Sequence, residues 1–288
     1  MRFLELKNIQ KTFVVARSFW GRPQAVVRAV DGVDIVMEQG ENLGLVGESG
    51  SGKTTLGRIL VRLLKEDSGE IFLDGVDIGR LTGRPLRRAR KQFQMIFQDP
   101  FSSLDPRFTI FSVLDEALWE ETSVKRSEKE ERIVAILKSV GLSGDILNRF
   151  PYEFSGGERQ RIAIARSLLL KPKLLVLDEA VSSLDVLVQA QILELLSDLQ
   201  RRMGITYLFI SHNLRVVRKL CHKIAVMYQG KIVESASSAE LFANPLHPYT
   251  RELLSAALNY KVAAPQVSFE RSSGSSLRDM GNGHWVLR

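Results

Sequence analysis

The stretch from Gly47 to Thr55, GESGSGKTT, has the composition and spacing of a loop that binds nucleotide phosphates. Its glycines permit a tight turn in which successive N–H groups and the positive end of a following helix face an anion. Lys53 is expected to reach the β- and γ-phosphates, Thr54 to bind Mg²⁺, and Thr55 to hydrogen-bond the α-phosphate. The expected nucleotide contacts are Gly47, Glu48, Ser49, Gly50, Ser51, Gly52, Lys53, Thr54 and Thr55.

Polar side chains also follow three other apolar, strand-like runs, namely Gln98, the pair Asp178-Glu179, and His212. Parallel strands place their carboxyl ends at one edge of a sheet, so these positions should converge with the phosphate loop. Structural alternatives exist: the acidic pair could favour the start of the next helix, and a histidine after a strand is often only a surface residue. The common position after a strand favours a shared site.

The chemistry expected at this edge is phosphoryl transfer to water. Asp178 is expected to hold Mg²⁺ opposite Thr54, with Gln98 sensing the metal or the water without adding charge. Glu179 is the candidate general base, and His212 could hydrogen-bond the γ-phosphate. The predicted catalytic set is therefore Lys53, Gln98, Glu179 and His212, and the predicted metal set is Thr54, Gln98 and Asp178.

A second anion site is indicated by Ser155, Gly156, Gly157 and Glu158, which precede a helix-forming stretch. Ser155 can cap the helix and the glycines permit close backbone approach to a phosphate. Ser-Gly-Gly is also a common turn. One phosphate loop and one remote phosphate contact in a chain suggest two chains that sandwich ATP between them.

The elements that must position these residues read as an α/β core. Strands and turns are expected over residues 2–40, with a long turn at 13–24, and buried strands at 43–46, 93–97, 174–178 and 205–211. Helices are expected after the phosphate loop, with an apolar stripe reaching Leu64, from a cap at Ser127, and over 188–203. Phe13, Phe19 and Trp20 are candidates to stack on adenine, with packing as the alternative.

Composition agrees with an intracellular α/β protein without choosing its partner. The 288 residues carry 40 Lys and Arg against 33 Asp and Glu, a net charge of +7. The excess would suit an anionic membrane face, nucleic acid or nucleotide, or only solubility. No run approaches the length of a membrane span, no signal-peptide core is visible at the first residues, and the single cysteine, Cys221, fits a reducing compartment.

Together the motifs resemble those of the ATP-binding subunits of ABC transporters. GESGSGKT resembles the Walker A loop, Gln98 the Q-loop, FSGGERQR the signature motif, LLVLDE the Walker B strand, SSLD the D-loop, and His212 the switch histidine. The resemblance implies a P-loop NTPase, RecA-like core with an N-terminal antiparallel β-subdomain and a helical signature subdomain. It also implies ATP and Mg²⁺ as ligands, Phe13 against adenine, Ser155 and Gly157 on the γ-phosphate of a partner's ATP, and Asp185 linking two sites.

The chain is most similar to the oligopeptide and dipeptide importer subfamily, through FQDPFSSLDPR, SSLDVLVQAQIL and NPLHPYTRELLSAAL. That resemblance implies an ATP-binding domain over residues 1–243, with a helical subdomain at about 99–171, and a C-terminal extension over 244–288. The implied partners are a second, non-identical ATPase, or a second copy in isolation, with two permeases and, indirectly, a solute-binding protein. The implied location is the cytoplasmic face of the cell membrane, with no nucleic acid bound.

Three alternatives stay open at this point. Nickel or metal–chelate importers belong to the same subfamily, a soluble ABC-type ATPase could act apart from transport, and a P-loop kinase could phosphorylate a small molecule.

Glu158 stands where the signature motif usually has Gln, which adds negative charge beside a phosphate-binding helix. Phe101, Leu104 and Phe108 are expected to form a permease-docking surface or to pack inside the insert.

Overall fold

The computed structural model describes residues 2–17, 23–97, 104–120, 122–258 and 277–287. These residues form two compact units, Met1–Leu86 with Tyr207–Arg288, and Arg87–Thr206. The predicted helical subdomain at 99–171 therefore falls inside the second unit. The mixture of sheets and helices is the predicted α/β class.

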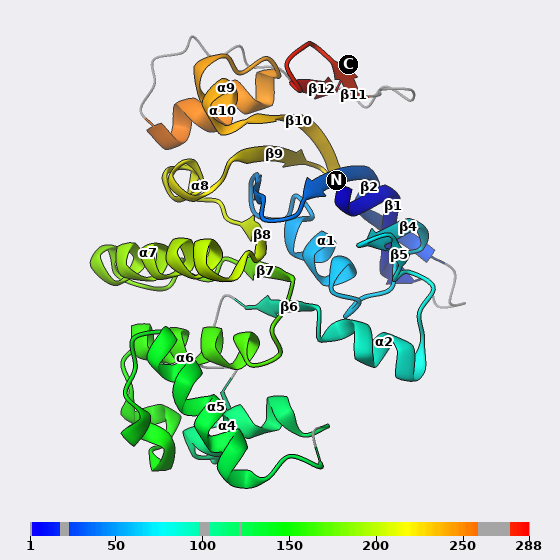
Figure 1. Ribbon diagram of the computed structural model, residues 1–288. Helices are drawn as coiled ribbons and strands as arrows, with labels where there is room; N and C mark the ends of the chain where they lie inside the picture. Colours follow the sequence, from blue (N-terminus) through cyan, green and yellow to red (C-terminus); the bar gives the residue numbers. More distant parts are fainter. Residues whose placement is uncertain (1, 18–22, 98–103, 121, 259–276, 288) are drawn as a thin grey trace. The chain divides into compact units, whose positions relative to one another are not determined.

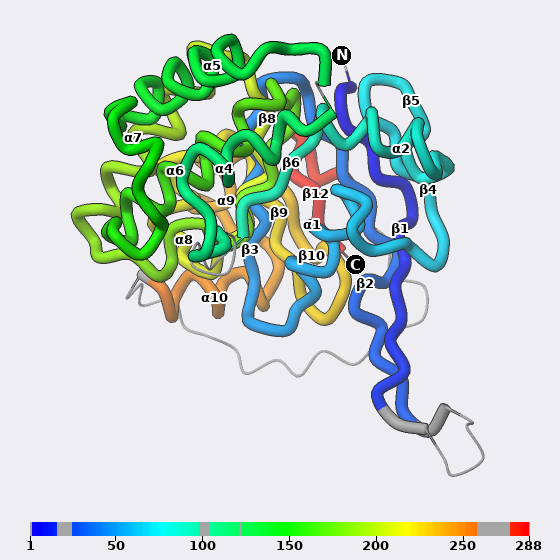
Figure 2. The backbone as a smooth tube through the Cα atoms, turned by 90° about the horizontal axis from the view of Figure 1, so that it is seen from below, coloured from blue at the N-terminus to red at the C-terminus, as the bar shows by residue number. Residues whose placement is uncertain are grey.

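In the first unit, an antiparallel sheet has the order β2-β1-β4-β5. It comprises β1 (Arg2–Arg17), β2 (Pro23–Glu38), β4 (Ser68–Leu73) and β5 (Val76–Asp77). Leu4 and Leu6 alternate onto its buried face, and Ile9 is buried again after the register shift that follows Leu6. The long turn predicted at 13–24 is wrong over most of its length, because β1 and β2 stay paired as far as Arg17 and Pro23. Figure 2 shows this ribbon running away from the other strands of the unit.

The second sheet of the first unit carries the phosphate loop. Its order is β11-β12-β10-β9-β3-β8, and β3 lies parallel to both β8 and β9. The strands are β3 (Asn42–Val46), β8 (Thr206–Ile210), β9 (Lys223–Tyr228), β10 (Lys231–Ser237), β11 (Leu277–Asp279) and β12 (Trp285–Leu287). All five residues of β3 and of β8 are buried, which explains their continuous apolar character.

Helices connect these strands. They are α1 (Lys53–Leu60), α8 (Leu214–Leu220), α9 (Ser238–Ala243) and α10 (Pro248–Leu258) (Figure 1). α1 ends before the predicted Leu64, because Arg62 has φ 56° and breaks the helical path. β9 and β10 form a hairpin whose turn residues, Gln229 and Gly230, both have positive φ, as a two-residue turn of this kind requires.

The second unit contains a parallel strand pair and a group of helices. β6 (Phe93–Ile96) pairs with β7 (Leu174–Asp178). The helices are α4 (Ile110–Asp115), α5 (Arg126–Ser139), α6 (Gly156–Leu168) and α7 (Val186–Met203), with short 3₁₀ turns at Glu116–Leu118, Gly144–Asn148 and Pro151–Glu153. α5 begins one residue before the predicted cap Ser127. α7 begins at Val186 because Asp185 caps it.

Two further features concern surfaces. α2 (Gly83–Arg90), with Arg87, Arg88 and Arg90 in its last turn, buries none of its residues and is therefore a solvated basic helix. Leu104 is buried, whereas Phe108 is 52% exposed. Gln98 and Phe101 lie outside the described residues. Within the described part of the chain, no helix has the length and apolar character needed to cross a membrane.

Candidate nucleotide site

The phosphate loop connects the buried strand β3 to helix α1, as its sequence predicts. Gly47, Gly50 and Gly52 have φ values of 151°, 82° and 108°, which other residue types adopt only with strain. Gly47 and Gly52 are also enclosed: an added Cβ would lie 2.1 Å from the Met227 oxygen and 2.0 Å from the Ala29 oxygen. Gly47 and Gly52 are therefore required both by backbone conformation and by close packing, and Gly50 by backbone conformation alone.

The helix end that follows this loop carries no competing charge. Gly52 occupies the N-cap of α1 without a side chain to offer the first N–H groups, and the first turn contains no acidic residue. The positive end of the helix dipole is thus left for an external anion. Thr54 and Thr55, at the second and third positions of the helix, are half-buried beside it.

Lys53 is folded over the loop itself. Its Nζ donates to the carbonyl oxygens of Gly47 at 2.9 Å and Glu48 at 2.7 Å, and lies 3.3 Å from Ser51 Oγ. Lys53 is 5% exposed, so its ammonium is buried against the oxygens of the loop. This places a buried ammonium where the predicted phosphates would lie.

His212 lies at the same edge of the sheet as the phosphate loop. It is an exposed residue between β8 and α8, and the preceding Ser211 donates its N–H to the Leu45 oxygen at 3.2 Å. Leu45 is two residues before Gly47. Parallel pairing of β3 with β8 therefore brings these two predicted site elements together.

In the second unit, β7 delivers the acidic pair. Asp178 is 5% exposed at the strand end, and Glu179, half-buried, has φ 50°, an uncommon value for a residue other than glycine. The Glu179 carbonyl accepts hydrogen bonds from Ser182 N at 3.0 Å and Ser182 Oγ at 2.9 Å. The turn after the strand thus fixes the backbone of the candidate base, a contribution of Ser182 that was not predicted from sequence.

The predicted second anion site is formed as a capped helix start. Ser155 Oγ accepts from Glu158 N at 3.3 Å and donates to Glu158 Oε2 at 2.7 Å, and Ser155 N donates to the same carboxylate oxygen at 2.9 Å. The hydroxyl of Ser155, followed by its N–H, holds the pKa of Glu158 below its ordinary value. The Ser-x-x-Glu spacing is the sequence signal for this capping box.

The glycines of this motif pack on the start of α7. A Cβ on Gly157 would lie 2.5 Å from Val188 Cγ1, and one on Gly156 would lie 3.4 Å from Leu184. Asp185 Oδ1 accepts from Leu187 N at 3.1 Å and Val188 N at 3.0 Å. Ser155, Gly157 and Asp185 are therefore brought into one local cluster, with Asp185 acting as a helix cap.

Other candidates lie elsewhere or are not described. Phe13 is 38% exposed on β1, with Lys11 Nζ 5.8 Å from its ring centre. Phe19, Trp20 and Gln98 lie outside the described residues. Cys221 is buried, and burial raises the pKa of its thiol, as suits a packed residue.

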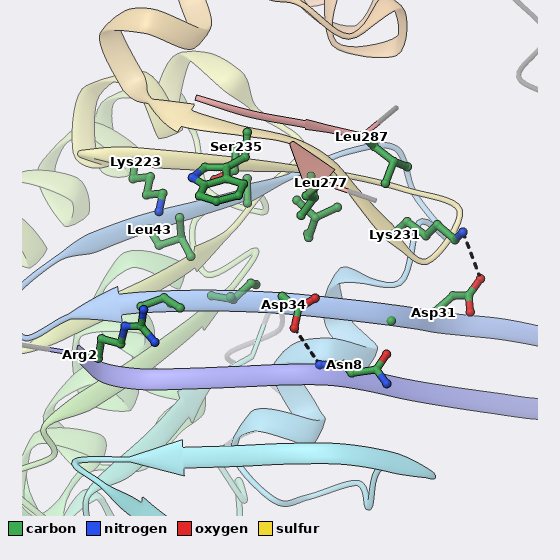
Figure 3. A pocket seen from close by; sticks show the side chains of 16 residues that line it. Arg2, Asn8, Asp31, Asp34, Leu43, Lys223, Lys231, Ser235, Leu277 and Leu287 are labelled. Atoms are coloured by element: carbon green, nitrogen blue, oxygen red, sulfur yellow. Dashed lines mark hydrogen bonds and ion pairs between the residues drawn. The ribbon is translucent and has the colours of Figure 1, made fainter. Parts of the chain in front are cut away.

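A cavity of about 760 Å³ in the first unit contains none of the predicted site residues among those that line it (Figure 3). It is bordered by both sheets of that unit. Asp34 in its wall accepts the N–H of Asn8 at 2.9 Å, and Lys231 lies 3.8 Å from Asp31. Because these wall charges have partners in the protein and the phosphate loop is absent from the wall, this cavity is not the candidate nucleotide site.

The chain is similar to known proteins along most of its length. Residues 30–182 match the ABC transporter family. The oligopeptide transport ATP-binding protein AppF of Bacillus subtilis is 47% identical over 88% of this chain and 77% of its own. A putative peptide import ATP-binding protein of Brucella ovis is 51% identical over 81% of this chain and 73% of its own.

A solved structure is also similar to this chain. The ATP-binding cassette MJ0796, solved as a dimer in a post-hydrolysis state with ADP and Pi, superposes with a TM-score of 0.72 at 26% identity. The match covers 82% of this chain and 98% of that one. The family match, the relatives that are about half identical along most of the chain, and the shared fold all agree: this protein belongs to the ABC transporter family, as one of its ATP-hydrolysing ATP-binding cassettes.

Proposed function

We propose that this chain powers the import of peptides, or of a related small solute, as a peripheral subunit on the cytoplasmic face of the cell membrane. The observation that carries this proposal is the pair of relatives, 47% and 51% identical over most of the chain, that are both named for peptide transport. The segment over residues 244–258 also supports it, because its sequence resembles that of the importer subfamily.

ATP would be bound first by the phosphate loop. The uncapped start of α1 would receive the phosphates, and Lys53 would turn its ammonium from the loop carbonyls toward the β- and γ-phosphates. Phe13, exposed on β1, would lie against adenine. His212, at the same sheet edge, would hydrogen-bond the γ-phosphate.

Mg²⁺ fits the donor atoms proposed for it. Thr54 offers a hydroxyl and Asp178 a buried carboxylate, both hard oxygen ligands, with Gln98 as the third proposed contact. Among the described residues, no cluster of three or more His, Cys, Asp or Glu side chains could hold a metal. Mg²⁺ commonly needs only one or two carboxylates together with phosphate oxygens. When bound, it would neutralise charge on the phosphate oxygens.

Glu179 would then accept a proton from the attacking water. Its backbone is held by Ser182, which limits the positions that the carboxylate can reach. Ser155, Gly156, Gly157 and Glu158 would face the γ-phosphate of a partner ATPase, and Asp185 would link the two sites. The partner would be a second, non-identical ATPase or, in isolation, another copy of this chain, with two permeases receiving the motion and a solute-binding protein supplying the solute.

The test is ATP turnover by the full chain assembled with its partner ATPase and permeases, comparing Glu179→Gln with Glu194→Gln, a change at an exposed carboxylate on α7. We expect Glu179→Gln to lower turnover by roughly two orders of magnitude or more while ATP binding survives and the closed dimer becomes long-lived. Glu194→Gln should change neither. Unchanged turnover in Glu179→Gln would mean that this chain's own site hydrolyses little and that its α6 start serves the partner's ATP.

The nature of the solute is tested separately. Turnover in proteoliposomes would be measured with the solute-binding protein loaded with a peptide mixture or with a nickel chelate. Stimulation by the peptides alone supports a peptide importer, and stimulation by the chelate alone would move the chain to the metal-importer alternative. Turnover that never depends on the permeases would instead favour a soluble ATPase.

A further inference from the structure

The C-terminal segment reaches the phosphate loop through one tyrosine. Tyr249, at the second position of α10, accepts a hydrogen bond on its hydroxyl from the backbone N–H of Glu48 at 2.9 Å. These residues are 201 positions apart in the sequence, and both lie in the first unit. Tyr249 is only 5% exposed, so solvent has little access to replace the phenol oxygen.

This hydrogen bond acts on the residue that also holds Lys53. The N–H of Glu48 is bound by Tyr249, while the carbonyl of Glu48 accepts from Lys53 Nζ at 2.7 Å. The peptide groups on both sides of the Glu48 Cα are thus fixed, one by Tyr249 and the other by Lys53. A further bond, from Gly230 N to the Ser51 oxygen at 2.9 Å, supports the loop three residues on.

The segment just before Tyr249 is held by a buried carboxylate. Glu234 on β10 is fully buried and accepts from the N–H groups of Leu246 at 2.8 Å and His247 at 2.9 Å. His284 in the C-terminal hairpin lies 2.6 Å from the same carboxylate through Nε2. The Tyr249 N–H then donates to His247 Nδ1 at 3.2 Å. Glu234 is therefore linked to the phosphate loop through two intermediate residues, His247 and Tyr249, each of which hydrogen-bonds to the next.

Ring packing fixes the direction of the phenol. The ring centres of Tyr249 and Tyr228 are 4.2 Å apart with 37° between their planes. Burial raises the pKa of Tyr249 to about 12, so the hydroxyl stays neutral at any physiological pH and its contact with the Glu48 N–H does not titrate there.

We propose that Tyr249 is a positioning residue for ATP binding, which holds Glu48 and through it Lys53 in the geometry that receives the phosphates. The segment at Asn244–Leu258 would then set the ATP affinity of the cassette. A phosphate loop without the Tyr249–Glu48 hydrogen bond adopts the geometry that binds ATP for a smaller fraction of the time. Its apparent affinity for ATP falls by the same fraction. This role goes beyond the proposed function, because it holds for any solute the transporter carries.

The test uses Tyr249→Phe in the full chain, which removes one hydroxyl and keeps the ring. We expect the Kd for ATP, measured with a fluorescent ATP analogue, and the KM for ATP to rise roughly two- to tenfold, in keeping with the loss of one hydrogen bond. The kcat should change by less than about twofold, because Glu179 and Ser182 are untouched.

The matched control is Tyr228→Phe. Among the residues that the structure describes, its hydroxyl accepts only an exposed contact from the Gln229 amide at 3.0 Å, and its ring still packs on Tyr249, so ATP affinity should stay the same. Hydrogen exchange over residues 47–52 gives a second readout. Exchange without ATP should be faster in Tyr249→Phe than in Tyr228→Phe, and saturating ATP should bring both close to the native chain.

Three results would overturn the proposal. One is a lower melting temperature in Tyr249→Phe with an unchanged Kd, which would leave Tyr249 as a packing residue only. Another is an equal loss of affinity in Tyr228→Phe. The third is a fall in kcat with unchanged KM and Kd. If Tyr249→Phe does not fold, Glu234→Gln takes its place. This change weakens the contacts that hold the segment before Tyr249, and it must also raise the Kd for ATP.

Discussion

Ser182 holds the carbonyl oxygen of Glu179 with two hydrogen bonds, from its N–H at 3.0 Å and from its hydroxyl at 2.9 Å. Glu179 has a left-handed backbone with φ 50°, so its conformation depends on such contacts. Asp178, immediately before it, remains within the buried strand. The turn at Ala180–Ser182 thus sets where the proposed base lies relative to its strand.

Ser182→Ala tests this relationship. The variant keeps the N–H contact and loses the hydroxyl contact, so we expect kcat for ATP hydrolysis to fall roughly two- to tenfold with little change in ATP affinity. Ser183→Ala is the control, because Ser183 is also exposed and its side chain makes no hydrogen bond within the described part of the chain. Equal rates in the two variants would show that the hydroxyl of Ser182 does not matter to the base.

Glu158→Gln should increase ATP hydrolysis at the site completed by this chain's α6. The Glu158 carboxylate accepts the hydrogen bond of the Ser155 hydroxyl, and its negative charge reduces the positive potential at the helix start. An amide oxygen can still accept from Ser155 N, so the cap survives without the charge. We expect turnover of the assembled pair to rise about two- to fivefold, and a decrease would mean that the charge assists the partner's site.

The same residue gives an acid-dependent contribution to stability. Hydrogen bonds from Ser155 lower the folded-state pKa of Glu158 from its ordinary value of 4.5. The ionised cap therefore contributes fully above the ordinary value, and this contribution is lost as pH falls through the lower folded-state pKa. Urea unfolding midpoints measured from pH 7 downward should fall less steeply in Glu158→Gln than in the native chain. Identical slopes would contradict this assignment.

Gly44→Ala should destabilise the sheet beneath the phosphate loop. Gly44 lies in β3, and an added Cβ would lie 2.3 Å from Val217 Cγ1 and 3.2 Å from Cys221 Sγ on the packed helix side. Overpacking of this kind costs about 1–3 kcal/mol in the free energy of unfolding, measurable in urea. Combining it with Val217→Ala should cost less than the sum of the two single changes, because the clash is relieved. An additive double variant would mean that the strand and helix separate instead.

The sequence by itself determined the local features of the site. A strand, a Gly-rich turn and a helix in immediate succession require the phosphate loop to form where Gly47–Thr55 stand, because each step is set by backbone geometry within a few residues. The apolar runs before Asp178 and His212 likewise predicted buried strands. The Ser155–Glu158 box was readable from its spacing, although only the Ser155 cap was predicted.

The tertiary structure decided the features that depend on distant parts of the chain. The sequence predicts a turn at 13–24, but pairing partners extend β1 and β2 through most of it. The Tyr249 hydroxyl accepts from the N–H of Glu48, 201 residues away in the sequence. This contact depends on β10, whose buried Glu234 binds the residues just before Tyr249. Such a contact leaves no periodicity or spacing in the sequence, since its energy comes from packing that exists only in the folded chain.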